Sequence, residues 1–189
     1  LRHRSRHEAA DGQTKIAADR PDHGAARAIG LGDDRIRAVG MGSYSPSEIA
    51  AYDAWVQQGG GLLLLAEHHA NDTLATHFGL QFKSITRGEC MLSIFANHPI
   101  TAGVAPIFYG AGSALISHPP SATVLGWLSL KTFVDLDGDG TKDPEESLKP
   151  AGLGVMPFGN GRIVFCGDTN LWETMPNPPL QNTLRWLST

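Results

Sequence analysis

The first clear hydrophobic pattern along the chain is a helix followed directly by a strand. Ser45, Pro46 and Glu48 place a capping serine, a proline at the first helical position and a glutamate three residues after the cap, which together predict the start of a helix. The glycines at residues 59–61 predict its end, because glycine tolerates the left-handed backbone found there. Residues 62–66 are apolar without alternation, which is typical of a strand covered on both faces in a parallel sheet.

The rest of the chain alternates short apolar runs with turn residues. A second helix is predicted over residues 71–78, and a last helix from the apolar stripe of Leu180, Leu184 and Leu187. Runs typical of strands occur at residues 90–95, 113–116, 124–130, 152–157 and 162–166. Asn160 and the glycine after it predict a tight hairpin between the last two runs. The alternation of helices and strands favours an α/β fold, and we expect a three-layer sandwich with a mainly parallel sheet.

Composition divides the chain near residue 42. Residues 1–42 are rich in Arg, His, Ala, Asp and Gly, and they hold eight of the 15 lysines and arginines. Such a segment buries too little apolar surface to offset the entropy lost on ordering, so we predict an irregular or disordered extension. The alternative is a basic arm that contacts an acidic partner. Residues 43–189 are expected to form one folded domain, with residues 135–146 as an insertion.

Charge, hydropathy and cysteine content exclude several classes of protein. A net charge of −4 and a pI near 6.0 argue against a nucleic-acid-binding protein, which requires a concentrated basic face. The longest apolar run is far shorter than the roughly 20 residues of a membrane-spanning helix, so no transmembrane segment is expected. Cys90 and Cys166 form neither a zinc ligand cluster nor a CxxC motif, and we predict no disulfide between them.

Residues 135–146 carry the most specific motif in the chain. They satisfy the pattern D-x-[DN]-x-[DN]-G-x5-E at every fixed place, and Gly140 allows the sharp bend at its sixth position. The predicted calcium ligands all supply oxygen: Asp135, Asp137, Asp139, the Thr141 carbonyl, Asp143 and Glu146. The alternative is an acidic turn that binds nothing, although closely spaced aspartates repel one another unless a cation is present.

The flanks of this loop differ from those of a paired EF-hand. Residues 127–134 have the pattern of a strand, and Pro144 and Pro150 restrict a helix after the loop. The motif resembles the DxDGDG calcium loops of dockerins and thrombospondin-type repeats. This resemblance implies a structural calcium between two strands and an extracytoplasmic location, either secreted or periplasmic.

A second polar group follows the buried run at residues 62–66. Glu67, His68 and His69, together with Asp168 after the last strand, are expected at the carboxyl edge of the sheet, where ligands bind in open α/β folds. Such side chains can bind a divalent metal or act in acid/base catalysis. The alternative is that they are hydrogen-bonded loop residues that cap the following helix.

Longer stretches resemble one superfamily. SPSEIAAYDAWVQQGGGLLLLAE at residues 45–67 resembles the helix, triple glycine and buried strand of class I glutamine amidotransferase-like domains, including uncharacterised bacterial and trehalose-utilisation-type ones. GNGRIVFCGD at residues 159–168 and NPPLQNTLRWLS at 177–188 are similar to the closing strand and helix of that superfamily. The resemblance implies an amidotransferase-like, flavodoxin-like fold. Active members use a cysteine on a sharp strand-to-helix turn, and neither Cys90 nor Cys166 has that context, so glutamine amidotransferase activity is not expected.

Two functional hypotheses follow. The leading one is a non-catalytic ligand- or protein-binding module, stabilised by calcium, in an exported bacterial protein whose small-molecule or protein partner is unknown. The alternative is a hydrolase that acts on a carbohydrate or related small substrate through Glu67, His68, His69 and Asp168.

Overall fold

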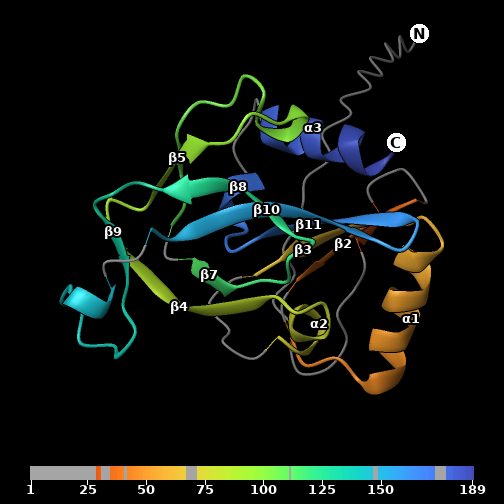
Figure 1. Cartoon of the computed structure of the whole chain (residues 1–189), viewed down its shortest axis with the longest axis horizontal. Helices are drawn as coiled ribbons and strands as arrows, with labels where there is room; N and C mark the ends of the chain where they lie inside the picture. The colour runs from red at the N-terminus through yellow and green to blue at the C-terminus, as the bar shows by residue number, and fades with distance from the viewer. Residues whose placement is uncertain are drawn as a thin grey trace, which may run out of the picture.

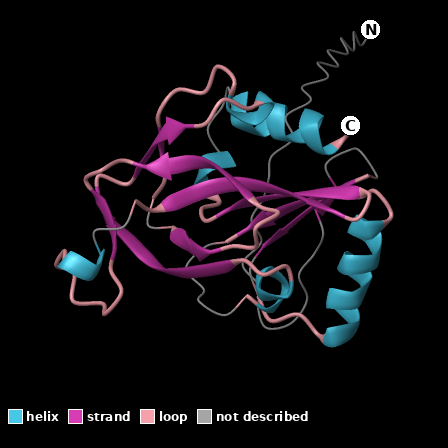
Figure 2. Cartoon of the chain, viewed as in Figure 1, coloured by secondary structure: helices cyan, strands magenta, loops and turns pink. Residues whose placement is uncertain are grey.

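One strongly curved sheet, with helices at its margins, dominates the structure (Figures 1 and 2). The computed structural model describes residues 29–30, 35–40, 42–66, 72–110, 112–146, 149–172 and 178–189. The strands in these residues are β1 Ile29–Gly30, β2 Ile36–Gly40, β3 Gly61–Leu65, β4 Gln81–Gly88, β5 Met91–Phe95, β6 Ile107–Phe108, β7 Ser113–Ser117, β8 Thr123–Leu128, β9 Thr132–Val134, β10 Ala151–Phe158 and β11 Gly161–Cys166. The α-helices are α1 Pro46–Gln57, α2 Thr73–His77 and α3 Pro178–Leu187, and the 3₁₀ turns are η1 Pro99–Thr101, η2 Pro144–Glu146 and η3 Asn170–Trp172.

The prediction of a three-layer sandwich with a mainly parallel sheet is wrong. The main path of the 11-stranded sheet runs β1-β2-β3-β11-β10-β7-β4-β9, and β8, β5 and β6 branch from β10. Within the described residues, only the β2–β3 and β3–β11 pairings are parallel, and the sheet curls into a half-barrel. A parallel neighbour needs a crossover connection, usually a helix. Helix α1 supplies one between β2 and β3, whereas no α-helix is described between β4 and β11, and the strands from β4 to β10 pair antiparallel with one another.

The predicted first helix is confirmed together with its cap. The Glu48 N–H donates to Ser45 Oγ at 3.3 Å, and the Ser45 N–H donates to Glu48 Oε2 at 2.8 Å, which completes a capping box at α1. The box satisfies two N–H groups that the first helical turn leaves without intrahelical partners. The start of α1 is therefore encoded locally by four consecutive residues.

The uninterrupted apolar run of β3 is explained by burial on both faces. Leu63 and Leu65 belong to a core cluster that also includes Leu187 of α3, while Leu62 and Leu64 belong to a second cluster that includes Val56 of α1. Successive side chains of a strand point to opposite faces, so every position of β3 must be apolar. The two clusters lie on the two faces of the sheet.

The predicted hairpin near the C terminus is also confirmed. β10 and β11 pair antiparallel, with Phe158 opposite Gly161, and the turn between them consists of Gly159 and Asn160. β11 then pairs in parallel with β3, in register from Arg162 to Cys166. This strand therefore joins the parallel and antiparallel parts of the sheet.

The sheet extends into the segment that composition assigned to an extension. β2 pairs in parallel with β3, and its Ile36, Ala38 and Val39 side chains are buried. Residues 1–28, 31–34 and 41 lie outside the described residues. Among the described helices, none is both long and apolar enough to span a membrane.

The end of β11 approaches β7 without room for a side chain. The Ser113 N–H donates to the Gly167 carbonyl at 2.8 Å, and the Gly167 N–H donates to the Gly152 carbonyl at 3.1 Å. A Cβ atom on Gly167 would overlap the Ser113 carbonyl oxygen and the Tyr109 hydroxyl. Only glycine fits at this crossing.

We therefore predict that Gly167→Ala lowers the free energy of unfolding by about 3 kcal/mol, because backbone atoms cannot move away as a flexible side chain can. Chemical denaturation monitored by circular dichroism measures this change. Gly42→Ala is the matched control, since a Cβ there meets no atom within 4 Å. Equal stability of the two variants would contradict the packing described at Gly167.

Candidate metal centre

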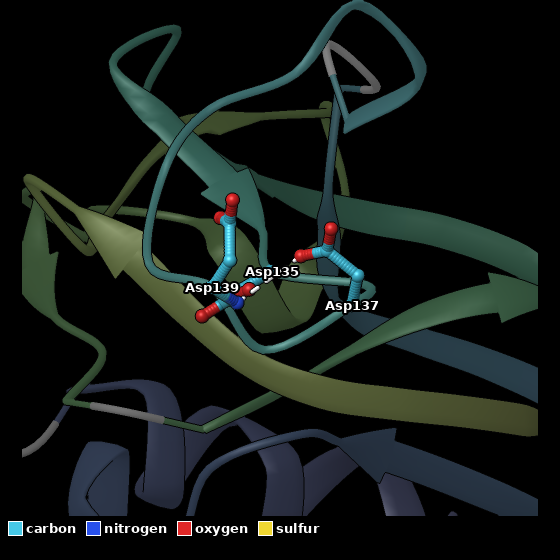
Figure 3. Close-up of side chains that lie close together, drawn as sticks. All are labelled: Asp135, Asp137 and Asp139. Carbon is cyan, nitrogen blue, oxygen red and sulfur yellow. Dashed lines mark hydrogen bonds between the residues drawn. The ribbon is translucent and has the colours of Figure 1, made fainter.

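The acidic loop is held at the far end of the sheet by β4 and β9. β9 pairs antiparallel with the last residues of β4, with Arg87 opposite Phe133, and Asp135 follows β9 directly. The loop ends in the η2 turn, where Glu146 is buried. Figure 3 shows the carboxylates of Asp135, Asp137 and Asp139 on this loop.

The structure brings the first three predicted ligands together. One carboxylate oxygen from each of Asp135, Asp137 and Asp139 lies within 4.8 Å of the others. Asp135 is buried, whereas Asp137 and Asp139 are exposed, so the cluster is open to solvent on one side. This cluster could hold a metal ion.

The backbone of the loop winds around these carboxylates. The Gly138 N–H donates to Asp135 Oδ1 at 2.8 Å, and the Asp139 N–H donates to Asp137 Oδ1 at 3.1 Å, an interaction that is visible in Figure 3. Gly138 and Gly140 have φ values of 83° and 79°, a left-handed conformation that glycine adopts without strain. The spacing of aspartates and glycines thus produces the tight curvature of the loop.

The remaining predicted ligands, Thr141, Asp143 and Glu146, lie in the second half of the loop. Glu146 accepts hydrogen bonds on both carboxylate oxygens, Oε1 from the Leu136 N–H at 2.5 Å and Oε2 from the Asp143 N–H at 3.2 Å. It therefore clamps the beginning of the loop to its end. Thr141 is exposed and Asp143 is partly buried, and among the described His, Cys, Asp and Glu side chains the group of mutually close ligand atoms consists of the three aspartates.

Negative charge is concentrated within the loop. Burial and the nearby carboxylates of Asp139, Asp137, Glu146 and Glu145 together raise the pKa of Asp143 above its usual range. A carboxylate resists ionisation where other carboxylates already repel its charge. A bound cation would relieve this repulsion.

Arg87 of β4 offsets part of this charge. Its Nε donates to Asp135 Oδ2 at 3.1 Å, and the arginine side chain is half exposed while Asp135 is 2% exposed. Burial acts to raise the pKa of Asp135, but the Arg87 hydrogen bond and the Gly140 and Gly138 N–H groups lower it overall. Asp135 therefore stays ionised although it is buried.

Of the predicted polar group at the strand edge, only Asp168 lies within the described part of the chain. Glu67, His68 and His69 lie outside the described residues. β2, β3 and β11 end in register, with Gly40 beside Leu65 and Leu65 beside Cys166. Asp168 follows the end of β11 by two residues and is fully buried.

Cys90 and Cys166 are both buried, and neither forms a disulfide bond. Cys166 is the last residue of β11, and its thiol lies 3.3 Å from the Asp168 carbonyl oxygen. Cys90 has a left-handed φ of 48°, but it leads into strand β5 rather than into a helix. Burial is the main cause that raises the pKa of the Cys90 thiol, which is the opposite of what an attacking thiolate requires.

Two notable residues were not singled out from the sequence. Arg87 had no local signal, because its partner Asp135 is 48 residues away in the chain. Asp72 did have a local signal in the sequence, since an aspartate directly before a helical pattern is a typical N-cap. Its Oδ1 accepts from the Leu74 and Ala75 N–H groups, and its buried Oδ2 has no hydrogen-bond partner among the described residues.

Comparisons with known proteins support the fold alone. No protein-family model matches the chain, and no curated protein sequence matches it. The chain is similar to the N-terminal domain of mmIFT52, with a TM-score of 0.60 at 12% identity over 82% of this chain and 77% of that one. It is also similar to a ThuA-like protein from Bacteroides uniformis ATCC 8492, with a TM-score of 0.51 at 18% identity over 81% of this chain and 69% of that one. At 12% and 18% identity, the two likenesses concern the fold, which this chain shares with a ThuA-like protein.

A weaker likeness involves a carbohydrate-active enzyme. A β-galactosidase from Rahnella sp. R3 matches with a TM-score of 0.46 at 11% identity, over 82% of this chain and 22% of that one. A score this low supports no conclusion about the chemistry of this chain.

The buried N-cap Asp72 predicts a specific pH dependence. Burial raises its pKa to about 6, against the lowering effect of the Ala75 and Leu74 N–H groups, while the unfolded value is about 3.9. Because the folded pKa is the higher one, the folded state holds the proton more tightly, and this contribution to stability is lost as pH rises from about 4 through about 6. We expect the loss to reach about 3 kcal/mol in the free energy of unfolding.

Asp72→Asn tests this prediction, because asparagine retains a capping oxygen and does not titrate. Urea unfolding of both proteins across this pH range should show the decline in the unmutated protein and a flatter profile in the variant. Parallel pH profiles would rule out Asp72 as the titrating group.

Proposed function

We propose that the chain is a non-catalytic binding module of an exported bacterial protein, and that its 135–146 loop takes up calcium as a structural ion. The observation that carries the metal part is the set of mutually close oxygens from Asp135, Asp137 and Asp139. These residues also occupy the first, third and fifth places of a complete calcium-loop motif.

The donor chemistry favours a hard cation. Carboxylate and carbonyl oxygens suit calcium, magnesium or manganese, whereas zinc and copper sites are typically built from histidine and cysteine. Calcium accepts six to eight oxygens in variable geometry, and an exposed loop with two left-handed glycines, Gly138 and Gly140, suits such a site. Magnesium demands a smaller octahedral site and gives up its water molecules reluctantly.

The position of the loop supports a structural role for the ion. The loop connects β9 with the segment that leads to β10, and Glu146 already clamps its two ends through backbone hydrogen bonds. A cation bound by the aspartates would further restrain this connection and offset the repulsion that raises the pKa of Asp143. Extracellular modules with such loops bind calcium with dissociation constants on the order of 0.1 to 1 mM, which fits an extracytoplasmic location.

The binding-module part of the proposal is supported by the cysteines. Both thiols are buried, and Cys90 has a raised pKa, so neither resembles an activated nucleophile. The likeness to the mmIFT52 N-terminal domain and to the ThuA-like protein supports only the fold of this module, and its role in recognition is part of the proposal. The partner would be a small ligand or another protein.

Calcium is expected to raise the melting temperature at millimolar concentration, because an ion that binds only the folded state stabilises it by about 2.7 kcal/mol at one hundred times its dissociation constant. Differential scanning calorimetry and titration calorimetry measure the shift and the binding heat. A chelator should reverse the shift, and magnesium should produce less of it.

Asp137→Asn and Asp139→Asn should remove most of this response. Both side chains are exposed, so their replacement should leave the fold without the ion largely unchanged. Glu145→Gln is the matched control, because it removes one exposed negative charge from the same loop outside the predicted ligand positions. If the unmutated protein shows neither binding heat nor a melting shift, the loop is an acidic turn and the calcium proposal is wrong.

A further inference from the structure

Cys90 adopts a backbone conformation that its side chain disfavours. Its φ of 48° is the only positive value among the described residues other than glycine. The left-handed conformation is strained for a residue with a Cβ atom, so surrounding contacts must hold it in place. Cys90 lies between the end of β4 at Gly88 and the start of β5 at Met91, and it is 7% exposed.

The contacts that hold Cys90 come mainly from β9 and β4. Its backbone N–H donates to Thr132 Oγ1 at 3.1 Å, and its thiol lies 3.9 Å from Thr86 Oγ1. Thr132 Oγ1 also lies 3.2 Å from Ser129 Oγ, which helps to fix the position of the acceptor. Outside these two strands, the Cys90 carbonyl accepts from the Tyr109 N–H at 2.8 Å.

The same two strands hold the acidic loop. In the short β4–β9 pairing, Thr86 lies opposite Val134 and Gly88 lies opposite Thr132. Arg87, between those two β4 residues, bonds Asp135 directly after β9. In this pairing of three residues from each strand, Asp135 follows the Thr86–Val134 end, the Cys90 turn follows the Gly88–Thr132 end, and Arg87 lies between them on β4.

We propose that the Arg87–Asp135 pair and the Cys90 turn form one conformational unit, which opens locally and exposes the Cys90 thiol when the pair is broken. Loss of the pair weakens the attachment of β9 to β4, and Thr132 then no longer holds the strained turn. Opening relieves the left-handed conformation, so strain favours the open state once the contacts are lost. The unit couples the charge balance at the acidic loop to the chemical accessibility of a thiol.

The experiment is alkylation of the full folded chain with iodoacetamide, followed by peptide mass spectrometry of each cysteine. Arg87→Gln should raise the rate at Cys90 about tenfold relative to the unmutated protein. Cys166 is an internal control, since it is fully buried in the main core, and its rate should not change. The Arg87 charge lowers the pKa of Cys90, so its removal without opening would slow alkylation rather than accelerate it.

Two further variants distinguish opening of this conformational unit from a general effect of lost charge and test the contact that holds the Cys90 turn. Lys83→Gln removes one positive charge from an exposed position of the same strand and should leave the Cys90 rate unchanged. Thr132→Val removes the acceptor for the Cys90 N–H while keeping a β-branched side chain, and it should raise the Cys90 rate without breaking the ion pair. The proposal is overturned if Arg87→Gln leaves Cys90 at the unmutated rate, or if Cys90 and Cys166 become reactive together, which would indicate global unfolding.

Calcium provides one more measurement, which rests on the proposed function. Asp135 can offer Oδ1 to a cation while Oδ2 stays on Arg87. A bound cation would therefore hold the loop and the pair in place, and millimolar calcium should slow Cys90 alkylation in the unmutated protein below its rate without calcium. If Arg87→Gln exposes Cys90 but calcium changes neither alkylation nor the melting temperature, the conformational unit stands and the calcium proposal fails. If calcium raises the melting temperature but Arg87→Gln leaves the Cys90 rate unchanged, the calcium proposal stands and the conformational unit fails.

Discussion

Burial of β3 on both faces is the constraint on which the rest of the structure depends. Its leucines contribute alternately to two core clusters, one covered by α3 and the other by α1 and α2. A strand covered on both faces needs hydrogen-bonded neighbours on both edges, because no water reaches its backbone. β2 and β11 supply them in parallel register. From β11 onward the sheet is free to continue antiparallel, and it curls away from a flat α/β arrangement.

The acidic loop depends on a different balance, between repulsion and compensation. The loop carries six carboxylates, at Asp135, Asp137, Asp139, Asp143, Glu145 and Glu146. Arg87 offsets the charge of Asp135, and backbone N–H groups of the loop itself donate to Asp135 and Asp139. Such a segment is ordered only as long as its charges are compensated. The loop is therefore the part of the described structure whose stability should respond most to ions.

Local signals predicted individual elements well but not their arrangement. The capping box at Ser45 and Glu48 and the turn at Gly159 and Asn160 involve residues within a few positions of one another, so their energetics are present in any context. The direction of strand pairing depends on which distant strand becomes a neighbour. The helix-strand-helix pattern near β3 suggested a mainly parallel sheet, but the strands from β4 to β10 pair antiparallel with one another, and only β11 returns to a parallel pairing with β3.

The sequence by itself determined the capped first helix, the doubly buried strand, the closing hairpin and the identity of the three clustered aspartates. Each of these follows from residue types at short, fixed spacings. Only the tertiary structure decided that Arg87 compensates Asp135, that Glu146 clamps the loop, and that Cys90 is held by Thr132. The motif had singled out Glu146, but its hydrogen bonds to the Leu136 and Asp143 N–H groups depend on how the loop folds. Arg87 and Asp135 are 48 residues apart, and Cys90 and Thr132 are 42 apart, so these pairs leave no pattern in the sequence because the sheet itself brings them together.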